Sequence, residues 1–257
     1  MTPSDSLPLS GRTAVITGST SGIGAAIART LAAAGAVVLV TGRDASRGES
    51  VVASITDNGG EARFLAVDLG GDYPGLRSFA ADATTLLGGR IDILVNNAGI
   101  YPATPTADLA DADLDAMLAV NLRAPHVLAA ELLPAMAAAG GGAVVNVGSW
   151  MGSVGNPFAA MYTATKAAVE QLTRSWSAEF GPRGVRVNTV SPGATLTPGN
   201  EAARAVLDAM TAGTPAGVVV RPADIADGVL FLASDAARMV HGSILAVDGG
   251  ISSTRGA

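Results

Sequence analysis

The sequence has no cysteine among its 257 residues and only two histidines. The absence of cysteine excludes disulfide bonds, thiolate metal sites and a cysteine nucleophile. His126 and His241 are too few for a histidine-rich metal cluster, so we expect no metal and interpret both as structural or surface residues. The sequence also lacks an uninterrupted run of about 18 apolar residues, and we therefore expect no membrane-spanning segment.

Basic residues are outnumbered by acidic ones, with 16 lysines and arginines against 22 aspartates and glutamates. The resulting net charge of −6 disfavours a nucleic-acid partner, because such a partner needs a basic surface. The segment before Gly11 is polar and contains prolines, without the apolar stretch of a secretion signal, so we expect a cytoplasmic protein. Apolar residues make up 49% of the chain, which is enough for one large core.

Lysine occurs once, at Lys166, and every other basic residue is arginine. The spacing Tyr162-x-x-x-Lys166 places the phenol and the ammonium on one face of a helix. A compact ammonium suits a point charge beside a phenol and a ribose, where the planar fork of arginine does not fit. A Tyr–Lys pair at this spacing is common by chance, so its interpretation depends on the surrounding motifs.

Short β-branched runs alternate with alanine-rich helical patterns along the whole chain. This alternation predicts an α/β fold with one doubly wound, parallel, seven-stranded sheet covered by helices on both faces, a Rossmann-type three-layer architecture. The expected strands are Thr13–Thr17, Val37–Thr41, Ala62–Val67, Ile91–Asn96, Ala143–Val147, Val185–Val190 and Ile244–Val247. The expected helices are Ile23–Ala34, Ser46–Asp57, Gly75–Leu87, Asp111–Ala139, Phe158–Phe180 and Ala223–Ala233.

No linker divides the chain, so we expect a single domain over residues 1–257, with a flexible tail over about residues 1–9. One long irregular stretch, residues 191–221, contains three prolines and a short helical pattern near Glu201–Ala209. Long irregular segments in compact domains commonly act as lids. We therefore expect residues 194–220 to cover a substrate.

The first expected strand runs into a glycine-rich turn, Thr17–Gly24, at the start of a helix. Glycines there allow a tight turn, a close approach of backbone to a pyrophosphate and close packing of helix on strand. The helix N-terminus adds free N–H groups and a positive dipole end. The pattern predicts a dinucleotide site, with contacts from Gly18, Ser21, Gly22, Ile23 and Gly24.

The end of the second expected strand indicates which dinucleotide is bound. An acidic residue there would hold the ribose 2′-hydroxyl of NAD(H), whereas an arginine accommodates the 2′-phosphate of NADP(H). Gly42 occupies the position of the acid and Arg43 follows it, which favours NADP(H). Asp44 leaves NAD(H) open, because a strand ending one residue later would bring this carboxylate to the ribose.

With the glycine turn, Asn96-Asn97-Ala98-Gly99 and Tyr162-x-x-x-Lys166 in this order, the chain resembles the short-chain dehydrogenase/reductase family over Leu9–Gly250. Ser191-Pro192-Gly193 and Val247-Asp248-Gly249-Gly250 fit the same family. The resemblance implies NAD(P)-dependent interconversion of a secondary alcohol and a ketone. It also implies four catalytic residues, which are Asn121, Ser149, Tyr162 and Lys166.

The same resemblance implies further contacts with the cofactor. Asp68 and Leu69 would lie at the adenine, and Asn96, Ala98 and Gly99 would lie on the adenosine side. The nicotinamide end would be held by Pro192, Gly193, Thr195, Thr197, Tyr162 and Lys166. No basic residue stands within the glycine turn, so the 2′-phosphate would rest on Arg43 alone.

We expect Tyr162 to act as the general acid/base, with Lys166 and the nicotinamide lowering its pKa from about 10 toward neutrality. Ser149 would donate a second hydrogen bond to the substrate oxygen, and Asn121 would hold a water that links Lys166 to solvent. Large side chains near Ser149 predict a substrate that is apolar near its reacting carbon. These side chains are Trp150, Met151 and Phe158, with Tyr101 facing the same cavity.

Two other functions stay open, as does the assembly. A ketoreductase of acyl thioesters on a carrier protein would need a basic docking patch, for which Arg123 and Arg174 are candidates. A dinucleotide-sensing protein would keep the fold without catalysis. By resemblance, we expect a homotetramer or homodimer that uses the helices Asp111–Ala139 and Phe158–Phe180, together with the C-terminal strand.

Overall fold

The computed structural model describes residues 7–254, and its strands form one parallel sheet in the order β3-β2-β1-β4-β5-β6-β7. The strands are β1 (Thr13–Ile16), β2 (Val37–Gly42), β3 (Glu61–Ala66), β4 (Ile93–Asn96), β5 (Gly142–Val147), β6 (Val185–Pro192) and β7 (Ile244–Val247). The predicted doubly wound sheet is confirmed. The chain reverses its direction of travel across the sheet between β1 and β4, and ligands of such sheets bind at this switch point.

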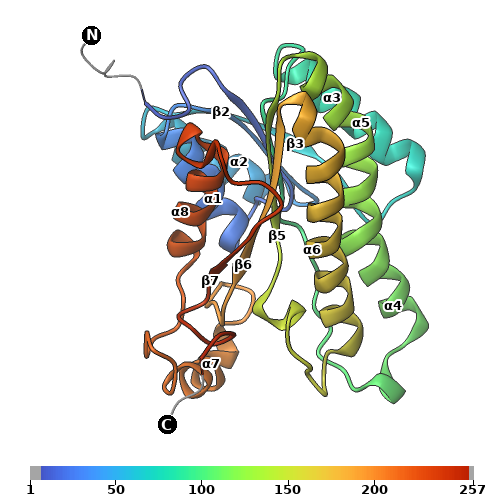
Figure 1. The fold of residues 1–257 in the computed structure, drawn as a ribbon, viewed down its shortest axis with the longest axis vertical. Helices are drawn as coiled ribbons and strands as arrows, with labels where there is room; N and C mark the ends of the chain where they lie inside the picture. The colour runs from blue at the N-terminus through green and yellow to red at the C-terminus, as the bar shows by residue number, and fades with distance from the viewer. Residues whose placement is uncertain (1–6, 255–257) are drawn as a thin grey trace.

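Helices cover both faces of the sheet (Figure 1). One layer contains α1 (Gly22–Ala33), α2 (Ala45–Thr56) and α8 (Pro222–Ala233). The other contains α3 (Tyr73–Leu86), α5 (Ala124–Ala138) and α6 (Ala160–Phe180), with α4 (Asp111–Leu118) leading into α5. The short helix α7 (Arg204–Thr211) lies outside both layers, near the C-terminus.

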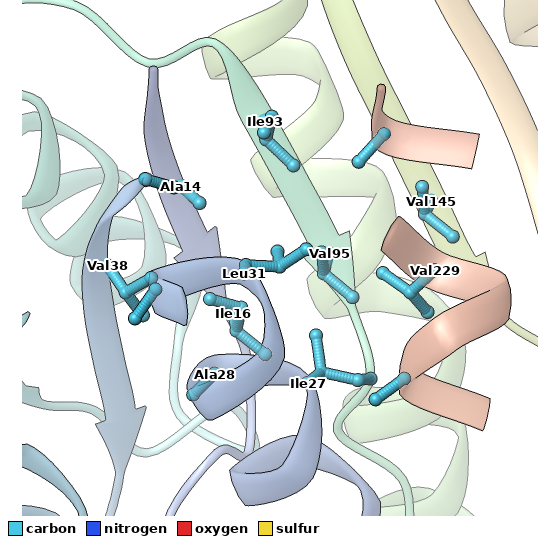
Figure 2. Packing of buried hydrophobic residues seen from close by; sticks show 14 of the residues in the cluster. Ala14, Ile16, Ile27, Ala28, Leu31, Val38, Ile93, Val95, Val145 and Val229 are labelled. Carbon is cyan, nitrogen blue, oxygen red and sulfur yellow. The ribbon is translucent and has the colours of Figure 1, made fainter. Parts of the chain in front are cut away.

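Burial on both faces explains why the central strands are continuously apolar. On β1, Ile16 joins the core beneath α1 and α8, whereas its neighbour Val15 joins the core beneath α3 and α5. Figure 2 shows the first of these cores, where Leu31 of α1 lies beside Val95 of β4, and Ile27 of α1 points toward Val229 of α8. Each of these side chains is fully buried, and burial of one such side chain stabilises the fold by roughly 1.5–3 kcal/mol.

The long helix expected over Asp111–Ala139 is interrupted. The structure has α4, a π-helical turn over Ala119–Arg123, and then α5. The wider turn changes the direction of the side chains within it, and such turns are frequent at functional sites. By length and hydropathy alone the stretch Asp111–Ala138 could cross a membrane, but 56% of its most apolar window is buried inside this fold, as in a core helix.

Two other boundaries differ from expectation. The expected helix Phe158–Phe180 begins at Ala160, because Phe158 lies in the preceding turn and is 60% exposed. Leu9, expected in the flexible tail over residues 1–9, is buried, and its N–H donates to the carbonyl of Ala34 at 2.8 Å. Leu7 and Pro8 are exposed, and residues 1–6 of that expected tail lie outside the described residues.

Candidate active site

The glycine-rich turn connects β1 to α1 at the carboxyl edge of the sheet. Gly18 and Gly22 have φ values of 64° and 54°, a region that L side chains rarely adopt. A Cβ on Gly24 would lie 2.3 Å from the carbonyl oxygen of Gly18, so only glycine lets α1 start this close to the strand. All three predicted glycines are therefore required by the geometry of the turn.

Asn97 holds this turn from the end of β4, and the sequence reasoning did not single it out. Its Nδ2 donates to the carbonyl oxygens of Thr17 and Gly18 at 2.8 and 3.1 Å. The hydroxyl of Thr17 in turn accepts from the backbone N–H groups of Asn97 and Ala98 at 2.9 and 3.0 Å. The doubled asparagine directly after a buried strand was the available signal, because a side chain there can bond backbone across the sheet edge.

The N-terminus of α1 is open to a ligand. Ser21 is the N-cap residue, but its side chain makes no capping bond, and the residue is exposed. Across from Gly22, a Cβ would be 3.4 Å from the side chain of Thr197, so these two expected contacts, distant in sequence, face each other. Uncapped N–H groups beside a glycine cradle fit the pyrophosphate of a dinucleotide.

The end of β2 separates the two residues that bear on cofactor choice. Arg43 is exposed just beyond the last residue of β2. Asp44 instead caps α2, accepting from Arg47 through the backbone N–H at 3.0 Å and through Nε at 2.7 Å. Because both oxygens of Asp44 are engaged, this carboxylate is not presented as a free acceptor for a ribose.

The expected adenosine-side residues lie in different environments. Asp68 is exposed and accepts from the N–H of Gly70 at 3.0 Å, whereas Leu69 is buried in the core. Asn96 is also buried, and its Nδ2 donates to Oδ1 of Asn146 at 2.8 Å. The side chain of Asn96 is therefore bonded within the sheet, and its Oδ1 is buried without a partner among the described residues.

Tyr162 and Lys166 lie on one face of α6, as their spacing predicts. Nζ of Lys166 is 5.7 Å from the centroid of the Tyr162 ring and donates to the carbonyl oxygen of Val147 at 2.8 Å. Gly99 lies beside the ammonium, since a Cβ there would be 3.5 Å from Nζ. The single lysine thus connects α6, the end of β5 and the turn after β4.

Burial dominates the electrostatics of this pair. It lowers the pKa of Lys166 to about 8, although the Glu170 carboxylate favours the charged ammonium. Burial also raises the pKa of Tyr162, against the effect of the neighbouring Ser149 hydroxyl, which lowers it. The expectation that the surroundings of Tyr162 lower its pKa is therefore not met by the protein groups alone, because desolvation of the phenolate outweighs them.

Asn121 lies in the π-helical turn and is almost fully buried. Its Oδ1 accepts from the N–H of Ile100 at 2.8 Å, and its Nδ2 donates to the carbonyl oxygen of Ile100 at 3.0 Å. Nδ2 also lies 3.3 Å from the hydroxyl of Thr165 on α6. Asn121 therefore holds the segment after Gly99 by bonding both the N–H and the carbonyl group of Ile100.

Ser149 follows β5 and is buried at the start of a short 3₁₀ turn, Trp150–Gly152. Its hydroxyl accepts from the N–H of Met151 at 3.2 Å and also interacts with Tyr162. The structure therefore brings together the four residues that the resemblance implied as catalytic.

The start of the expected lid is tied to the end of the sheet. Gly193 lies against Asp248, where a Cβ would be 2.6 Å from a backbone atom, and its N–H donates to Val247. Asn200 then orders the next turn, accepting from the N–H of Thr197 at 2.7 Å and donating to the carbonyl oxygen of Thr195 at 2.9 Å. Residues 193–200 are thus held beside the glycine turn.

Aromatic and apolar side chains surround Tyr162 unevenly. The rings of Tyr101 and Tyr162 are 4.6 Å apart between centroids, so Tyr101 does face this site. Met151 is buried beside Ser149, whereas Phe158 is largely exposed. His126 and His241 are exposed, and residues 7–254 contain no group of His, Asp or Glu arranged to hold a metal.

The chain matches known proteins over most of its length. A family model described as enoyl-(acyl carrier protein) reductase matches residues 18–252. The cis-4-hydroxycyclohexanecarboxylate dehydrogenase of Sinomonas cyclohexanicum is 41% identical over 245 residues, which cover 93% of this chain and 96% of that enzyme. The D-threitol dehydrogenase of Mycolicibacterium smegmatis is 39% identical over 244 residues, which cover 94% of this chain and 93% of that enzyme.

A solved structure supports both the fold and the class of cofactor. The crystal structure described as an NAD(P)-dependent gluconate 5-dehydrogenase from Beutenbergia cavernae, with bound NADP, has a TM-score of 0.91 and 41% identity. The match covers 97% of this chain and 100% of that one. The chain belongs to the short-chain dehydrogenase/reductase family and is an NAD(P)-dependent oxidoreductase of secondary alcohols and ketones.

Proposed function

We propose that Tyr162 exchanges the proton in this reaction, with Ser149, Lys166 and Asn121 as its partners. The observation that carries the proposal is the convergence of these four side chains at the carboxyl edge of the sheet, beside the glycine turn. A sensor would need the turn but not this set, so the complete set favours an enzyme over a dinucleotide-sensing protein.

In the direction of reduction, the Tyr162 phenol donates its proton to the oxygen on which negative charge grows, and Ser149 donates a second hydrogen bond. A bound nicotinamide dinucleotide supplies or accepts the hydride. In the direction of oxidation, Tyr162 takes the alcohol proton as a phenolate. Burial opposes this phenolate, so the positive charge of Lys166 has to offset the lost hydration.

The geometry sets the size of that offset. At 5.7 Å, the distance from Nζ to the ring centroid, and an effective dielectric constant of about 20, the ammonium would stabilise a unit negative charge on the ring by roughly 3 kcal/mol. Lys166 must keep its proton for this, and it does so below a pKa of about 8. Its bond to Val147 holds the ammonium within the site, where it could also bond the hydroxyls of a nicotinamide ribose.

Asn121 is proposed as a positioning residue. Its amide holds Ile100 on both sides, and through it the Gly99 turn that faces Lys166. We expect the water that links Lys166 to solvent to bind the same Asn121 amide that holds Ile100. Loss of the Asn121 amide would therefore loosen the Gly99–Ile100 segment and remove the binding group of any water there.

For the cofactor, we propose that NADP(H) is favoured and that NAD(H) is the weaker ligand. Arg43 is exposed at the end of β2, and Asp44 is engaged by Arg47 and the α2 backbone. The exposed guanidinium could pair with a 2′-phosphate, which would otherwise meet no basic side chain of the glycine turn.

We also propose that residues 194–220 form the substrate lid, closing over a substrate that is apolar near its reacting carbon. The lid is anchored at its base by pairing between Thr195 and Val220, and it carries α7 outside the helical layers. Its base is beside the cofactor cradle, so its closure would exclude water from the reacting atoms.

For assembly, we propose a homodimer or homotetramer, located in the cytoplasm. A groove of about 840 Å³ lies between α4, α5 and α6, with a mainly apolar lining. Its apolar side chains include Leu118, Leu122 and Leu172, and Ala168 lets a partner helix approach closely. A two-fold copy of the same face would fill this groove.

The carrier-protein ketoreductase remains the second candidate, because a solved structure described as a 3-oxoacyl-(acyl-carrier-protein) reductase from Agrobacterium tumefaciens is 34% identical to this chain. Its expected docking patch finds little support. Arg123 directs its guanidinium to the carbonyl oxygens of Gly70 and Gly71, and Arg174 donates to the carbonyl oxygen of Glu170 at 3.0 Å. Arg123 is therefore engaged within the protein, and the exposed Arg174 alone does not make a basic patch for an acidic carrier.

The test is a screen of the purified protein against secondary alcohols with NADP⁺ and NAD⁺, and against ketones with NADPH and NADH, following NAD(P)H absorbance. We expect turnover of small apolar secondary alcohols and ketones, and faster turnover with NADP(H). No turnover of any alcohol or ketone, with cofactor still bound, would instead support a sensing role. Turnover restricted to acyl thioesters would favour the ketoreductase.

A further inference from the structure

Tyr101 contacts the proposed acid/base residue directly. Its ring is tilted by 59° to the ring of Tyr162, and their centroids are 4.6 Å apart. Tilted aromatic pairs at this distance attract each other, so the contact is a stable one. Tyr101 is nevertheless 48% exposed, which leaves much of its surface free to meet a ligand.

The backbone next to Tyr101 is fixed. Ile100 is bonded at both its N–H and its carbonyl by the buried amide of Asn121. The segment therefore cannot swing away from Tyr162 without breaking two hydrogen bonds, both of them to a side chain that is only 2% exposed. Tyr101 is thus held in place at the side of the site, where its ring forms a wall next to Tyr162.

The position of this wall restricts the substrate. The substrate oxygen must come within hydrogen-bond distance of the Tyr162 phenol for proton transfer. One substituent of the carbinol carbon would then extend toward Tyr101, which follows β4. Met151, a buried apolar residue, lies next to Ser149 after β5. A saturated ring can pack flat on an aromatic face, whereas the hydroxyls of a linear polyol would lose water there without gaining a partner.

We infer that Tyr101 is a specificity-determining residue that selects carbocyclic secondary alcohols, such as cyclohexanols, over linear polyols. The inference rests on the proposed function, because it takes the proton-exchanging role of Tyr162 as given. The known relatives include one enzyme named for a hydroxycyclohexane and one named for a four-carbon polyol, so overall identity does not discriminate between these substrate classes. We expect the Tyr101 ring beside Tyr162 to discriminate between them.

The test compares the protein with its Tyr101→Ala and Tyr101→Phe variants, using cyclohexanol and D-threitol with NADP⁺. We expect the unchanged protein to prefer cyclohexanol. Tyr101→Ala should lower kcat/KM for cyclohexanol by about tenfold, mainly through a higher KM, and change that for D-threitol by less than about twofold. Tyr101→Phe keeps the aromatic face and should keep the preference.

Cofactor affinity, measured by fluorescence titration, should be the same in all three proteins, which separates a lost substrate contact from a misfolded site. The inference is overturned if Tyr101→Ala lowers both activities equally, if it leaves their ratio unchanged, or if the unchanged protein prefers D-threitol. Each of these results leaves the proposed proton exchange by Tyr162 intact, and a preference for D-threitol would in addition contradict the proposed apolar substrate. Failure of the unchanged protein to oxidise any alcohol would overturn the proposed function and this inference together.

Discussion

Tyr162 and Lys166 both lie where their charged forms are less well solvated than in water, Lys166 being buried and Tyr162 partly buried. Burial raises the pKa of the phenol and lowers that of the ammonium. Both shifts disfavour the charged forms, yet the proposed chemistry uses a phenolate beside an ammonium. Perturbed pKa values in a cleft are typical of groups that exchange protons, because such groups must be able to take either form near neutral pH.

Glu170 lies one helical turn after Lys166 on the same face of α6, and it provides a residue-scale prediction. Its carboxylate favours the protonated form of Lys166, so Glu170→Gln should lower the pKa of Lys166 further below about 8. Ketone reduction depends on the ammonium, and the loss of kcat/KM with rising pH should therefore begin at a lower pH in the variant. The measurement is the pH profile of kcat/KM for both proteins.

The profiles should converge at acid pH. Burial raises the pKa of Glu170 itself, and once this carboxyl is protonated it no longer differs in charge from glutamine. A variant with the same alkaline limb as the unchanged protein would show that Glu170 does not act on Lys166. Arg174→Gln, which changes the charge at the other neighbour of Glu170, is the matched control for a general electrostatic effect.

Among the elements, the strands and the turns that follow them were the most predictable from the sequence. Apart from their terminal threonines, Thr13–Thr17 and Val37–Thr41 are continuously apolar because both faces of the sheet are covered, and this pattern locates them in the sequence. The π-helical turn at Ala119–Arg123 was not predictable, because the apolar pattern continues through it unbroken. Only the tertiary bonds of Asn121 to Ile100 show why the helix widens there.

The glycine turn gives an element-scale prediction. Gly24→Ala would place a Cβ 2.3 Å from the carbonyl oxygen of Gly18 and 2.5 Å from Nδ2 of Asn97. We expect the turn to open, with at least about a tenfold loss of cofactor affinity and a lower melting temperature, since such overpacking commonly costs about 1–3 kcal/mol. Titration of NADPH fluorescence and thermal unfolding measure the two effects.

Gly213→Ala is the matched control for that change. A Cβ on Gly213 would meet nothing within 4 Å, so the same substitution there should leave both quantities unchanged. Equal affinity for NADPH in Gly24→Ala and the unchanged protein would contradict the assignment of this turn to the cofactor.

For the whole molecule, the parallel, doubly wound arrangement of the sheet followed from the sequence, but the meeting of distant segments did not. The alternation of strands and helices predicts which ends of the strands share an edge. It does not predict that Asn97 bonds the glycine turn, that Lys166 reaches Val147, or that Tyr101 rests on Tyr162. Each of these contacts joins residues far apart in sequence, and each depends on side-chain directions that no local pattern encodes.

Assembly is the prediction that belongs to this scale. Ala168 lines the groove between α4, α5 and α6, and Ala168→Arg would place a long charged side chain in it. We expect light scattering to give a dimer or tetramer for the unchanged protein and a smaller particle for the variant. Ala53→Arg, at an exposed position of α2 in the opposite helical layer, should keep the larger mass. A monomeric mass for the unchanged protein would contradict the proposal.

The most direct test of the account is the activity of Tyr162→Phe, compared with Tyr73→Phe at an exposed tyrosine of α3. Removing the Tyr162 hydroxyl should lower kcat by about 10²–10⁴-fold, the usual contribution of a general acid/base, while NADPH still binds with nearly unchanged affinity. Tyr73→Phe should retain full activity. A Tyr162→Phe protein that turns over substrate within a few-fold of the unchanged enzyme would contradict the central claim that this phenol exchanges the proton.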